Sequence, residues 1–388
     1  MATGMSLPRL AHSLSRPWLQ LFILYLLVLG VALPLIGQGR RHSYYFRRST
    51  YLRQLTDEAL MQSLERAEEA ERYFQNAEVG EGGGSGKEED PPQLAVAIVT
   101  TVRSQGTEYR YYLQVASAFH RLLRECKWCR SYRLFACNVH HHPKEHWQVE
   151  MASRLVPVIQ RFREEGQEVP ESDRFEKEKA DYLFCLGQGL EFQPKFILML
   201  EDDALPSSDF FPVLQDILER RLKGQDPLYV KLYHPERLQG YLHPEPARIL
   251  EWVGLGALGG CLLSCLHYLT TGQHSLTSFC ALAALSMLGA EMYGRVYLLE
   301  VRRASPQLYI LAPASECCTP AMVYTAEGTQ RVLRYLGQQK CRQGYAKDTA
   351  LYQALRQERE TAYVVEPNLV SHIGLYSTLR GWVGQPSL

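Results

Sequence analysis

The sequence has no excess of charge of either sign. Its 388 residues include 42 Lys and Arg and 42 Asp and Glu, which gives a formal net charge of zero at pH 7. This balance excludes the strong basic field by which nucleic-acid-binding proteins attract phosphates, so we expect no nucleic acid among the partners. With 46% hydrophobic residues, the chain can instead bury a large core, enough for one large or two ordinary domains.

A phosphate-binding loop of the nucleotide-triphosphatase type is also missing. The nearest candidate is EGGGSGKEE, residues 81–89, which has Glu81 in place of the first glycine and Glu88 in place of the Ser or Thr. An apolar strand followed by acids is half of a triphosphatase site, and the chain does contain such a strand. Without the loop, that interpretation of the strand is excluded.

Cysteine is sparse, with ten residues in the chain. One CxxC pair, Cys126 and Cys129, has no second pair with which to complete a four-ligand zinc site. In an oxidising compartment we expect structural disulfides, formed locally or with Cys137 and Cys185, and a redox pair is the alternative.

Two other clusters of potential ligands carry less information. Cys317 and Cys318 are adjacent and are not expected to bridge each other, so Cys341 is the expected partner of one of them. The histidines at 140–142, with His146, suggest zinc because imidazole is a common ligand, but their spacing matches no zinc motif. We expect a surface loop at the end of a strand there.

The chain is organised around Phe196 to Ala204, FILMLEDDA. Its apolar part does not alternate, which indicates a strand buried on both faces in the middle of an α/β sheet. The acids Glu201, Asp202 and Asp203 follow, at the end of the strand where ligands bind in such sheets. Carboxylates suit Mg²⁺ or Mn²⁺, which can carry a nucleotide diphosphate. The alternative is a solvated turn leading into a helix that begins near residues 207–209.

Trp18 to Ile36 is a charge-free run long enough to cross a membrane as a helix. We expect a retained anchor rather than a signal peptide, because no convincing small-x-small cleavage site follows. Arg9 and Arg16 precede the run and four arginines follow it within residues 40–48, so the count of positive charges favours an outside N-terminus.

The stretches after this run and in the middle of the chain indicate how the domain is attached to the membrane. Apolar residues recur with helical spacing from Tyr51 to Phe74, which predicts a stem helix, and the Gly-rich stretch 79–92 predicts a flexible linker. Apolar runs at 252–270 and 276–290 are joined by a short turn and predict a membrane hairpin, with a buried helical hairpin as the alternative. Their small residues suit close packing of membrane helices. Because a hairpin returns to its starting side, the parts of the domain before and after it share one compartment.

Strands and helices alternate through the rest of the chain, which predicts an α/β fold. Asp348 begins the last expected helix. We expect strands at 94–102, 132–139, 229–233, 295–311 and 363–365, and helices ending near 123 and spanning 145–164, 175–190, 322–336 and 344–355.

A membrane anchor, a stem, a linker and an α/β domain with acids after a buried strand resemble a Golgi type II glycosyltransferase with the metal-dependent GT-A fold. Residues 175–204 and LVSHIGLYSTL at 369–379 are similar to the EDD donor-site segment and the C-terminal HxG segment of the N-glycan-branching N-acetylglucosaminyltransferases of type four. A GT-A domain split by tandem membrane spans is similar instead to the Golgi transferases that add an N-acetylgalactosamine side chain to the first mannose of GPI anchors. This resemblance covers essentially the whole chain.

The resemblance implies transfer from UDP-N-acetylgalactosamine (UDP-GalNAc) with inversion to a β linkage, Mn²⁺ as cofactor, and GPI-anchored proteins as acceptors. It also implies a multi-pass Golgi membrane protein with a lumenal catalytic domain, which overrules the count of positive charges. In such a site the acids bridge metal and diphosphate. Asp203 is then the best single ligand, with Asp202 and Glu201 supporting it or contacting ribose, and His372 contacts metal or diphosphate.

Inversion requires a base opposite the leaving group, and Asp348 is the candidate. Its competitors are Glu316, Glu327 and Asp209. Weaker candidates for the donor site are Thr100, Thr101 and Arg103, at the end of the first strand, and Asp181, on the helix before the acids.

The expected organisation is a cytoplasmic tail (1–17), a transmembrane anchor (18–36), a stem helix and linker (37–92), the donor-site part of a GT-A domain (93–250), a transmembrane hairpin (251–294) and the acceptor-side part of the domain (295–388). In this hypothesis the hairpin holds the active site near a membrane-bound acceptor. The alternatives are another Golgi GT-A activity, such as N-acetylglucosamine transfer to a glycoprotein glycan, or a non-catalytic lumenal receptor for GPI-anchored proteins.

Overall fold

The computed structural model describes residues 17–76, 90–162, 173–243, 245–272 and 275–376. The chain forms two compact units: unit 1 is Met1–Gln54 with Glu236–Glu300, and unit 2 is Leu55–Pro235 with Val301–Leu388. The first boundary falls inside helix α4 (Arg48–Asn76). The expected linker lies outside the described residues apart from positions 90–92.

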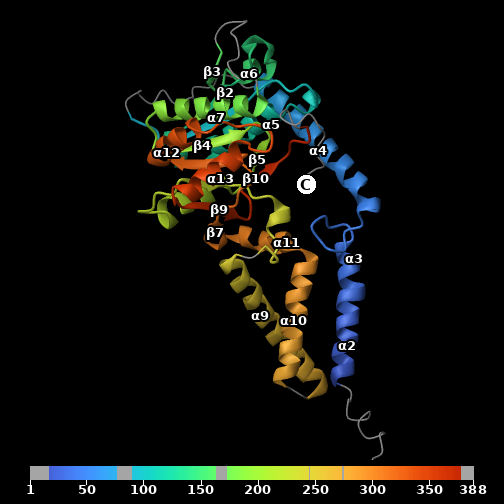
Figure 1. Ribbon diagram of the computed structural model, residues 1–388. Coiled ribbons are helices and arrows are strands. Elements are labelled where there is room, and N and C mark those ends of the chain that lie inside the picture. Colours follow the sequence, from blue (N-terminus) through green and yellow to red (C-terminus); the bar gives the residue numbers. More distant parts are fainter. Residues whose placement is uncertain (1–16, 77–89, 163–172, 244, 273–274, 377–388) are drawn as a thin grey trace, which may run out of the picture. The chain divides into compact units, whose positions relative to one another are not determined.

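Unit 2 is built on a mixed eight-stranded sheet flanked by helices, which confirms the predicted α/β, GT-A-like class (Figure 1). Its strands are β1 (Leu94–Thr100), β2 (Tyr132–Asn138), β3 (Val158–Gln160), β4 (Phe196–Glu201), β6 (Tyr229–Lys231), β7 (Ile310–Pro313), β8 (Ala321–Thr325) and β9 (Ala362–Glu366). The order across the sheet is β3-β2-β1-β4-β8-β6-β9-β7. β1 is parallel to β2 and β4, whereas β8 is antiparallel to both of its neighbours, β4 and β6. The parallel half therefore brings the carboxyl ends of β1 and β4 together.

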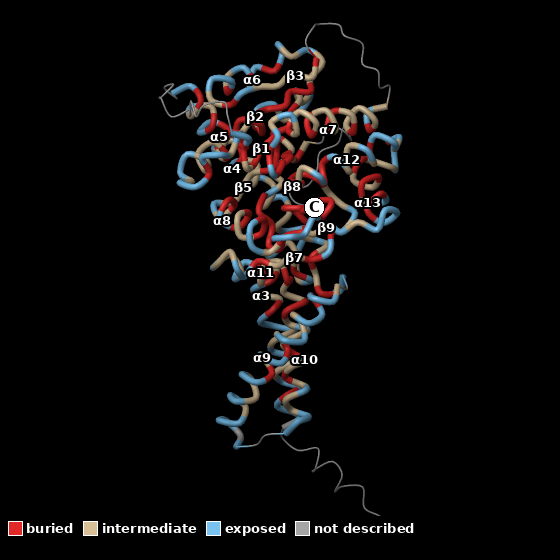
Figure 2. Tube along the Cα trace, turned by 90° about the vertical axis from the view of Figure 1, so that its left-hand side faces the viewer, coloured by how far each residue is buried: buried red, intermediate tan, exposed pale blue. Residues whose placement is uncertain are grey.

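The sheet separates two hydrophobic cores, because the side chains of each strand point alternately to its two faces. On β1, Leu94, Val96 and Ile98 belong to one core, and Ala95 and Ala97 to the other. The central strands of the sheet are buried over most of their length (Figure 2). The first core is covered by α4, α5 (Tyr111–Glu125), α6 (Trp147–Ala152) and α8 (Phe210–Gln215), and the second by α7 (Arg174–Glu191), α12 (Ala326–Gly337) and α13 (Lys347–Gln357).

The helix predicted from residue 51 to 74 is confirmed as α4, and its C-terminal half packs into unit 2. Ala70 and Phe74 are buried in the first core. Arg66 Nε donates to Gln114 Oε1 at 2.9 Å, and Tyr73 Oη lies 2.7 Å from His120 Nδ1. These contacts fix that half of α4 against α5.

Unit 1 contains, among the described residues, three helical segments long and apolar enough to cross a membrane: Trp18–Gly37, Pro246–Thr270 and Leu276–Tyr293. The first comprises α2 (Pro17–Leu27), a π-helical turn (Val28–Ala32) and α3 (Leu33–Gly37), and the others are α9 (Pro246–Thr271) and α10 (Leu276–Tyr293). The two helices of the hairpin pack closely, because a Cβ added at Gly260 would lie 3.0 Å from Ala283 Cα. The close packing predicted from the small residues is confirmed.

The N-terminal span also contacts α10. Tyr25 Oη donates to the carbonyl oxygen of Ala281 at 2.6 Å, and Ser43 Oγ donates to that of Met292 at 2.8 Å. At the end of α10, Tyr44 Oη donates to Glu291 Oε1 at 3.0 Å. The N-terminal span and the hairpin are therefore packed against each other within unit 1.

The predicted helix at 145–164 is wrong. Among its described residues only Trp147–Ala152 is α-helical, and Val158–Gln160 is strand β3, paired with β2. Pro157 opposes a helix through this segment, because proline donates no backbone hydrogen bond and disfavours the helical conformation of the preceding residue.

The predicted strand at 295–311 is also wrong, apart from its last residues. The segment is helical at α11 (Arg295–Leu299), and two short 3-10 turns follow before β7 begins at Ile310. Gly294, with φ +110, ends α10 and redirects the chain into α11. The predicted helix at 322–336 begins only at Ala326, because Met322 to Tyr324 are fully buried β-prone residues that pair with β4.

The disulfides confirm one expectation and correct another. Cys126 pairs locally with Cys129, and Cys137 on β2 pairs with Cys185 on α7. Cys317 pairs with Cys318, contrary to the expectation that one of them bridges to Cys341. Cys341 is instead buried as a free thiol in the second core, where its N–H donates to a carboxylate of α7.

Candidate active site

The acids of FILMLEDDA lie where two parallel strands end. β4 pairs with β1 so that Val99 is opposite Glu201, which brings Thr100 and Asp202 to the same edge of the sheet. Thr100 Oγ1 donates to Asp202 Oδ2 at 2.9 Å and lies 2.9 Å from His146 Nε2. Burial lowers the pKa of His146 to about 4, with a contribution from the nearby His140, so the imidazole is neutral at pH 7.

Arg103 binds both aspartates of the motif. Its Nη2 contacts Asp202 Oδ1 and lies 2.9 Å from Asp203 Oδ2, and its guanidinium carbon lies 4.8 Å from the centre of the Tyr111 ring. Burial raises the pKa of Asp202, and the charge of Asp203 adds to this effect. Burial also acts to raise the pKa of Asp203, but the charges of His372 and Arg103 outweigh it and lower that pKa. Asp203 is therefore the more firmly ionised of the two aspartates.

The C-terminal segment runs alongside the acids. Strand β10 (Val370–His372) pairs antiparallel with β5 (Ala204–Pro206), which directly follows them. His372 Nε2 lies 3.5 Å from Asp203 Oδ1, and the N–H of Ile373 donates to the Asp203 carbonyl oxygen at 2.9 Å. Gly374 approaches Asp203 so closely that a Cβ there would overlap the carboxylate. Ser377 of the same sequence segment lies outside the described residues.

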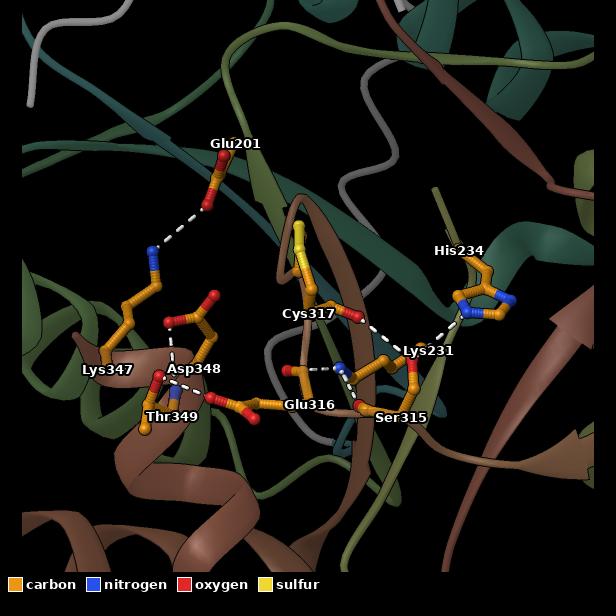
Figure 3. Close-up of a disulfide and its surroundings, with 10 residues drawn as sticks. Glu201, Lys231, His234, Ser315, Glu316, Cys317, Lys347, Asp348 and Thr349 are labelled. Atoms are coloured by element: carbon orange, nitrogen blue, oxygen red, sulfur yellow. Dashed lines mark hydrogen bonds and ion pairs between the residues drawn. A yellow bond between two sulfur atoms is a disulfide. The ribbon is translucent and has the colours of Figure 1, made fainter. Parts of the chain in front are cut away.

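Glu201 is held by a buried lysine. Lys347 Nζ lies 3.0 Å from Glu201 Oε1 and 2.5 Å from Glu178 Oε1 on α7. Burial acts to lower the pKa of Lys347, but the two carboxylates outweigh it and raise that pKa above its usual value. The ammonium is therefore charged. It links α13 to the end of β4 through Glu201 (Figure 3), and to α7 through Glu178.

Glu201, Asp203 and His372 can together hold a divalent cation. Each offers one ligand atom, and these atoms all lie within 4.8 Å of one another. Asp203 Oδ1 is buried and accepts no hydrogen bond from the described residues, which leaves it available as a ligand. Two carboxylates and an imidazole suit Mn²⁺ as a ligand set. Asp202 differs, because both of its oxygens are engaged by Thr100 and Arg103.

Asp348 lies in the first turn of α13, as predicted. Its Oδ1 accepts a hydrogen bond from the N–H of Thr349 at 2.9 Å, and Thr349 Oγ1 donates to Glu316 Oε1 at 2.8 Å. A carboxylate oxygen of Asp348 and the sulfurs of Cys317 and Cys318 lie within 4.8 Å of one another (Figure 3). Of its competitors, Glu316 lies beside it, Asp209 bonds to Tyr309, and Glu327 is in the first turn of α12.

The remaining candidates make other contacts. Thr101 Oγ1 lies 3.3 Å from His140 Nδ1. Asp181 forms ion pairs with Arg161 and with Lys177, at 2.6 Å from the lysine. The histidine run follows β2 directly, and among the described residues no group with metal-ligand geometry includes it. The predicted loop at the end of the strand is confirmed.

Sequence reasoning missed Lys347 and the role of His146. Each is a single residue without a motif, and each acts through partners distant in the sequence, Glu178 and Glu201 for Lys347 and Thr100 for His146. The only local signal was that Lys347 precedes Asp348.

The part of the chain that contains these sites matches a known protein family. A family model described as GPI-N-acetylgalactosamine transferase PGAP4 matches residues 94–371, more than half of the 388 residues. The match includes the acids at the end of β4, Asp348 and the first two residues of β10. The chain therefore belongs to the GPI-N-acetylgalactosamine transferase PGAP4 family, which is a family of glycosyltransferases.

Proposed function

We propose that this protein transfers N-acetylgalactosamine from UDP-GalNAc to the first mannose of the GPI glycan, with inversion to a β linkage. The single observation that best supports the donor half is the cluster of Glu201, Asp203 and His372 at the end of β4, with a buried carboxylate oxygen that accepts no hydrogen bond from the described residues. The acceptor half rests on the family match.

The donor diphosphate is held at this cluster. Asp203, Glu201 and His372 are the residues that would hold Mn²⁺, and Asp203 would be the primary ligand because its buried Oδ1 accepts no hydrogen bond from the described residues. When bound, the cation supplies Lewis-acid stabilisation of negative charge on the departing UDP. Gly374 leaves room for the carboxylate of Asp203, and Lys347 holds that of Glu201.

Thr100 acts on the donor through Asp202, and Arg103 through both Asp202 and Asp203. Both bind the Asp202 carboxylate, so they fix the backbone turn that presents Asp203. Thr101, at the end of β1, is the residue we propose to contact the nucleotide directly, since nucleotides bind at the carboxyl ends of such strands. We do not extend the donor site to Asp181, because Arg161 and Lys177 already neutralise its carboxylate.

Asp348 is the proposed base. It takes the proton of the reacting mannose hydroxyl at a carboxylate oxygen, while the N–H of Thr349 fixes the orientation of the carboxylate. Glu316 accepts a hydrogen bond from Thr349 Oγ1 and so keeps that residue in place.

We propose a lumenal catalytic unit in the Golgi membrane with a cytoplasmic N-terminus. The distribution of the cysteines supports this orientation. The three disulfides lie in unit 2, whereas Cys261, Cys265 and Cys280 are free and lie in the apolar helices α9 and α10. Disulfides persist in the oxidising secretory lumen and not in the cytosol.

The test is transfer by the detergent-solubilised full chain, with UDP-GalNAc and a mannose-containing GPI glycan fragment. We expect transfer that EDTA abolishes and Mn²⁺ restores, and an Asp203→Asn variant that stays folded but is inactive at saturating Mn²⁺. The exposed acid Glu150 provides the control, and Glu150→Gln should be fully active. Unchanged turnover of Asp203→Asn would sink the metal-site assignment.

A further inference from the structure

The loop between β7 and β8, residues 314–320, is held from beneath by buried ionisable side chains. Lys231, on β6 and 1% exposed, donates from Nζ to the carbonyl oxygens of Ser315 at 2.6 Å and Glu316 at 3.0 Å. His234, 2% exposed, lies with Nε2 at 3.1 Å from Ser315 Oγ. Both interactions converge on Ser315 (Figure 3).

His234 is in turn oriented by Glu366. The Nδ1 atom of His234 lies 3.0 Å from Glu366 Oε1, and Glu366 is fully buried on β9. A carboxylate oxygen accepts hydrogen bonds, so we assign a ring proton to Nδ1, and this bond fixes the orientation of the imidazole. The single hydroxyl proton of Ser315 has two partners within the protein, the Cys317 carbonyl oxygen, to which it donates at 3.3 Å, and His234 Nε2 at 3.1 Å.

In this arrangement the hydroxyl oxygen of Ser315 can act as a hydrogen-bond acceptor for a ligand. Because the hydroxyl proton is directed to a partner within the protein, the oxygen of Ser315 keeps a lone pair that can accept a hydrogen bond from a ligand. Ser315 is half-buried, so the hydroxyl is not sealed in the core. Burying ionisable groups such as His234 and Glu366 is unfavourable unless they are well paired. We therefore infer that the pair does more than hold a surface loop.

The same loop lies next to Asp348, the proposed base. The sulfurs of Cys317 and Cys318 lie within 4.8 Å of a carboxylate oxygen of Asp348 and of each other. Glu316 Oε1 accepts from Thr349 Oγ1 at 2.8 Å, which ties the loop to α13 (Figure 3). Ser315 is therefore two residues from the disulfide that lies beside Asp348.

We propose that Ser315, oriented by His234 and Glu366, binds a non-reacting hydroxyl of the acceptor sugar and so orients that sugar beside Asp348. The hydroxyl donates to Ser315 Oγ, and no covalent bond forms. His234, Glu366 and Lys231 are positioning residues, since they act through Ser315 and its loop. The ligand class is a hexopyranose with a free hydroxyl next to the reacting one. This inference rests on the proposed transferase function.

The test measures acceptor and donor kinetics of the full chain separately. Loss of one hydrogen bond predicts an acceptor KM about tenfold higher for Ser315→Ala, with the KM for UDP-GalNAc unchanged. Ser315→Thr, which keeps the hydroxyl, should be close to the original protein. Ser153→Ala, which removes an exposed hydroxyl on the surface, is the matched control. A merely structural loop residue would change donor and acceptor constants together.

Acceptors that each lack one non-reacting hydroxyl of the mannose sharpen this test. One of them should bind the original protein about tenfold more weakly, and Ser315→Ala should not weaken it further. Equal losses for every deoxy acceptor in both proteins, or an unchanged acceptor KM, overturn the proposal while transfer itself still stands. Absence of transfer by the original protein would instead overturn the proposed function. Labelling of Ser315 by a fluorophosphonate also overturns the inference, because it would mark the serine as a nucleophile.

Discussion

Lys347 Nζ lies 3.0 Å from Glu201 Oε1, with the lysine side chain 7% exposed. This ion pair joins the helix that carries Asp348 to the strand that carries the acids. A second carboxylate, Glu178 on α7, lies 2.5 Å from the same ammonium. One buried cation therefore links the proposed base and the proposed metal ligands.

Replacing Lys347 by methionine should destabilise unit 2 and reduce turnover. The substitution leaves the carboxylates of Glu178 and Glu201 without their buried counterion, and breaking such a pair lowers the free energy of unfolding by about 3 kcal/mol or more. Denaturant unfolding of the purified protein measures the loss. Adding Glu178→Gln should recover part of it, because one unpaired charge is then removed. Lys223→Ala, at an exposed lysine, is the control and should be neutral.

Gly374→Ala should damage activity much more than stability. A Cβ at 374 would overlap the Asp203 carboxylate, so the carboxylate must move. Displacement of a reacting or binding group by about 1 Å can lower the reaction rate about 100-fold. We expect a decrease of about that size in kcat/KM. Gly187→Ala is the matched control, because nothing lies within 4 Å of a Cβ there and the residue is on helix α7. Equal activity of the two variants would contradict the close approach.

Stability should fall as the pH falls below about 6.5. Burial lowers the pKa of His146 to about 4 in the folded chain, so between that value and the ordinary pKa the unfolded state binds more protons. Linkage then makes the free energy of unfolding rise with pH, and lowering the pH from 7 to 5 removes about 2 kcal/mol through this group. Unfolding at several pH values, for the original protein and for His146→Gln, measures the contribution by difference. Identical pH slopes would show that His146 is not the titrating group.

The hairpin should tolerate a large side chain at one glycine of α9 and not at another. A Cβ added at Gly260 would lie 3.0 Å from Ala283 Cα, whereas nothing lies within 4 Å of a Cβ at Gly254. Gly260→Leu should lower the thermal midpoint in detergent, because overpacking is worth about 1–3 kcal/mol. Gly254→Leu, on the same helix, should leave it unchanged. A similar midpoint for both would mean that α9 and α10 do not pack as described.

Much of the fold follows from local patterns in the sequence. The non-alternating apolar residues of FILMLEDDA predicted a central strand, and β4 is buried on both faces with parallel and antiparallel neighbours. Two errors arose where apolar runs lacked a clear period. Residues 295–311 are mostly helical, and Met322 to Tyr324 are a strand although they precede a helix.

The site could be predicted only in part, because its contacts join distant segments. The acids and His372 carry recognisable chemistry, but no local signal indicates that Lys347 binds Glu201 or that His146 contacts Thr100. The pairing of Cys317 with Cys318 also depends on the path of the loop between β7 and β8. Such relationships appear only once the chain has folded.

The most direct test of the central claim is mass spectrometry of GPI glycans from cells that lack this protein. We expect glycans that have lost one N-acetylhexosamine. The original chain should restore this sugar, and Asp203→Asn, expressed at the same level in the same membrane, should not. Restoration of the sugar by Asp203→Asn, or glycans unchanged by loss of the protein, would contradict it.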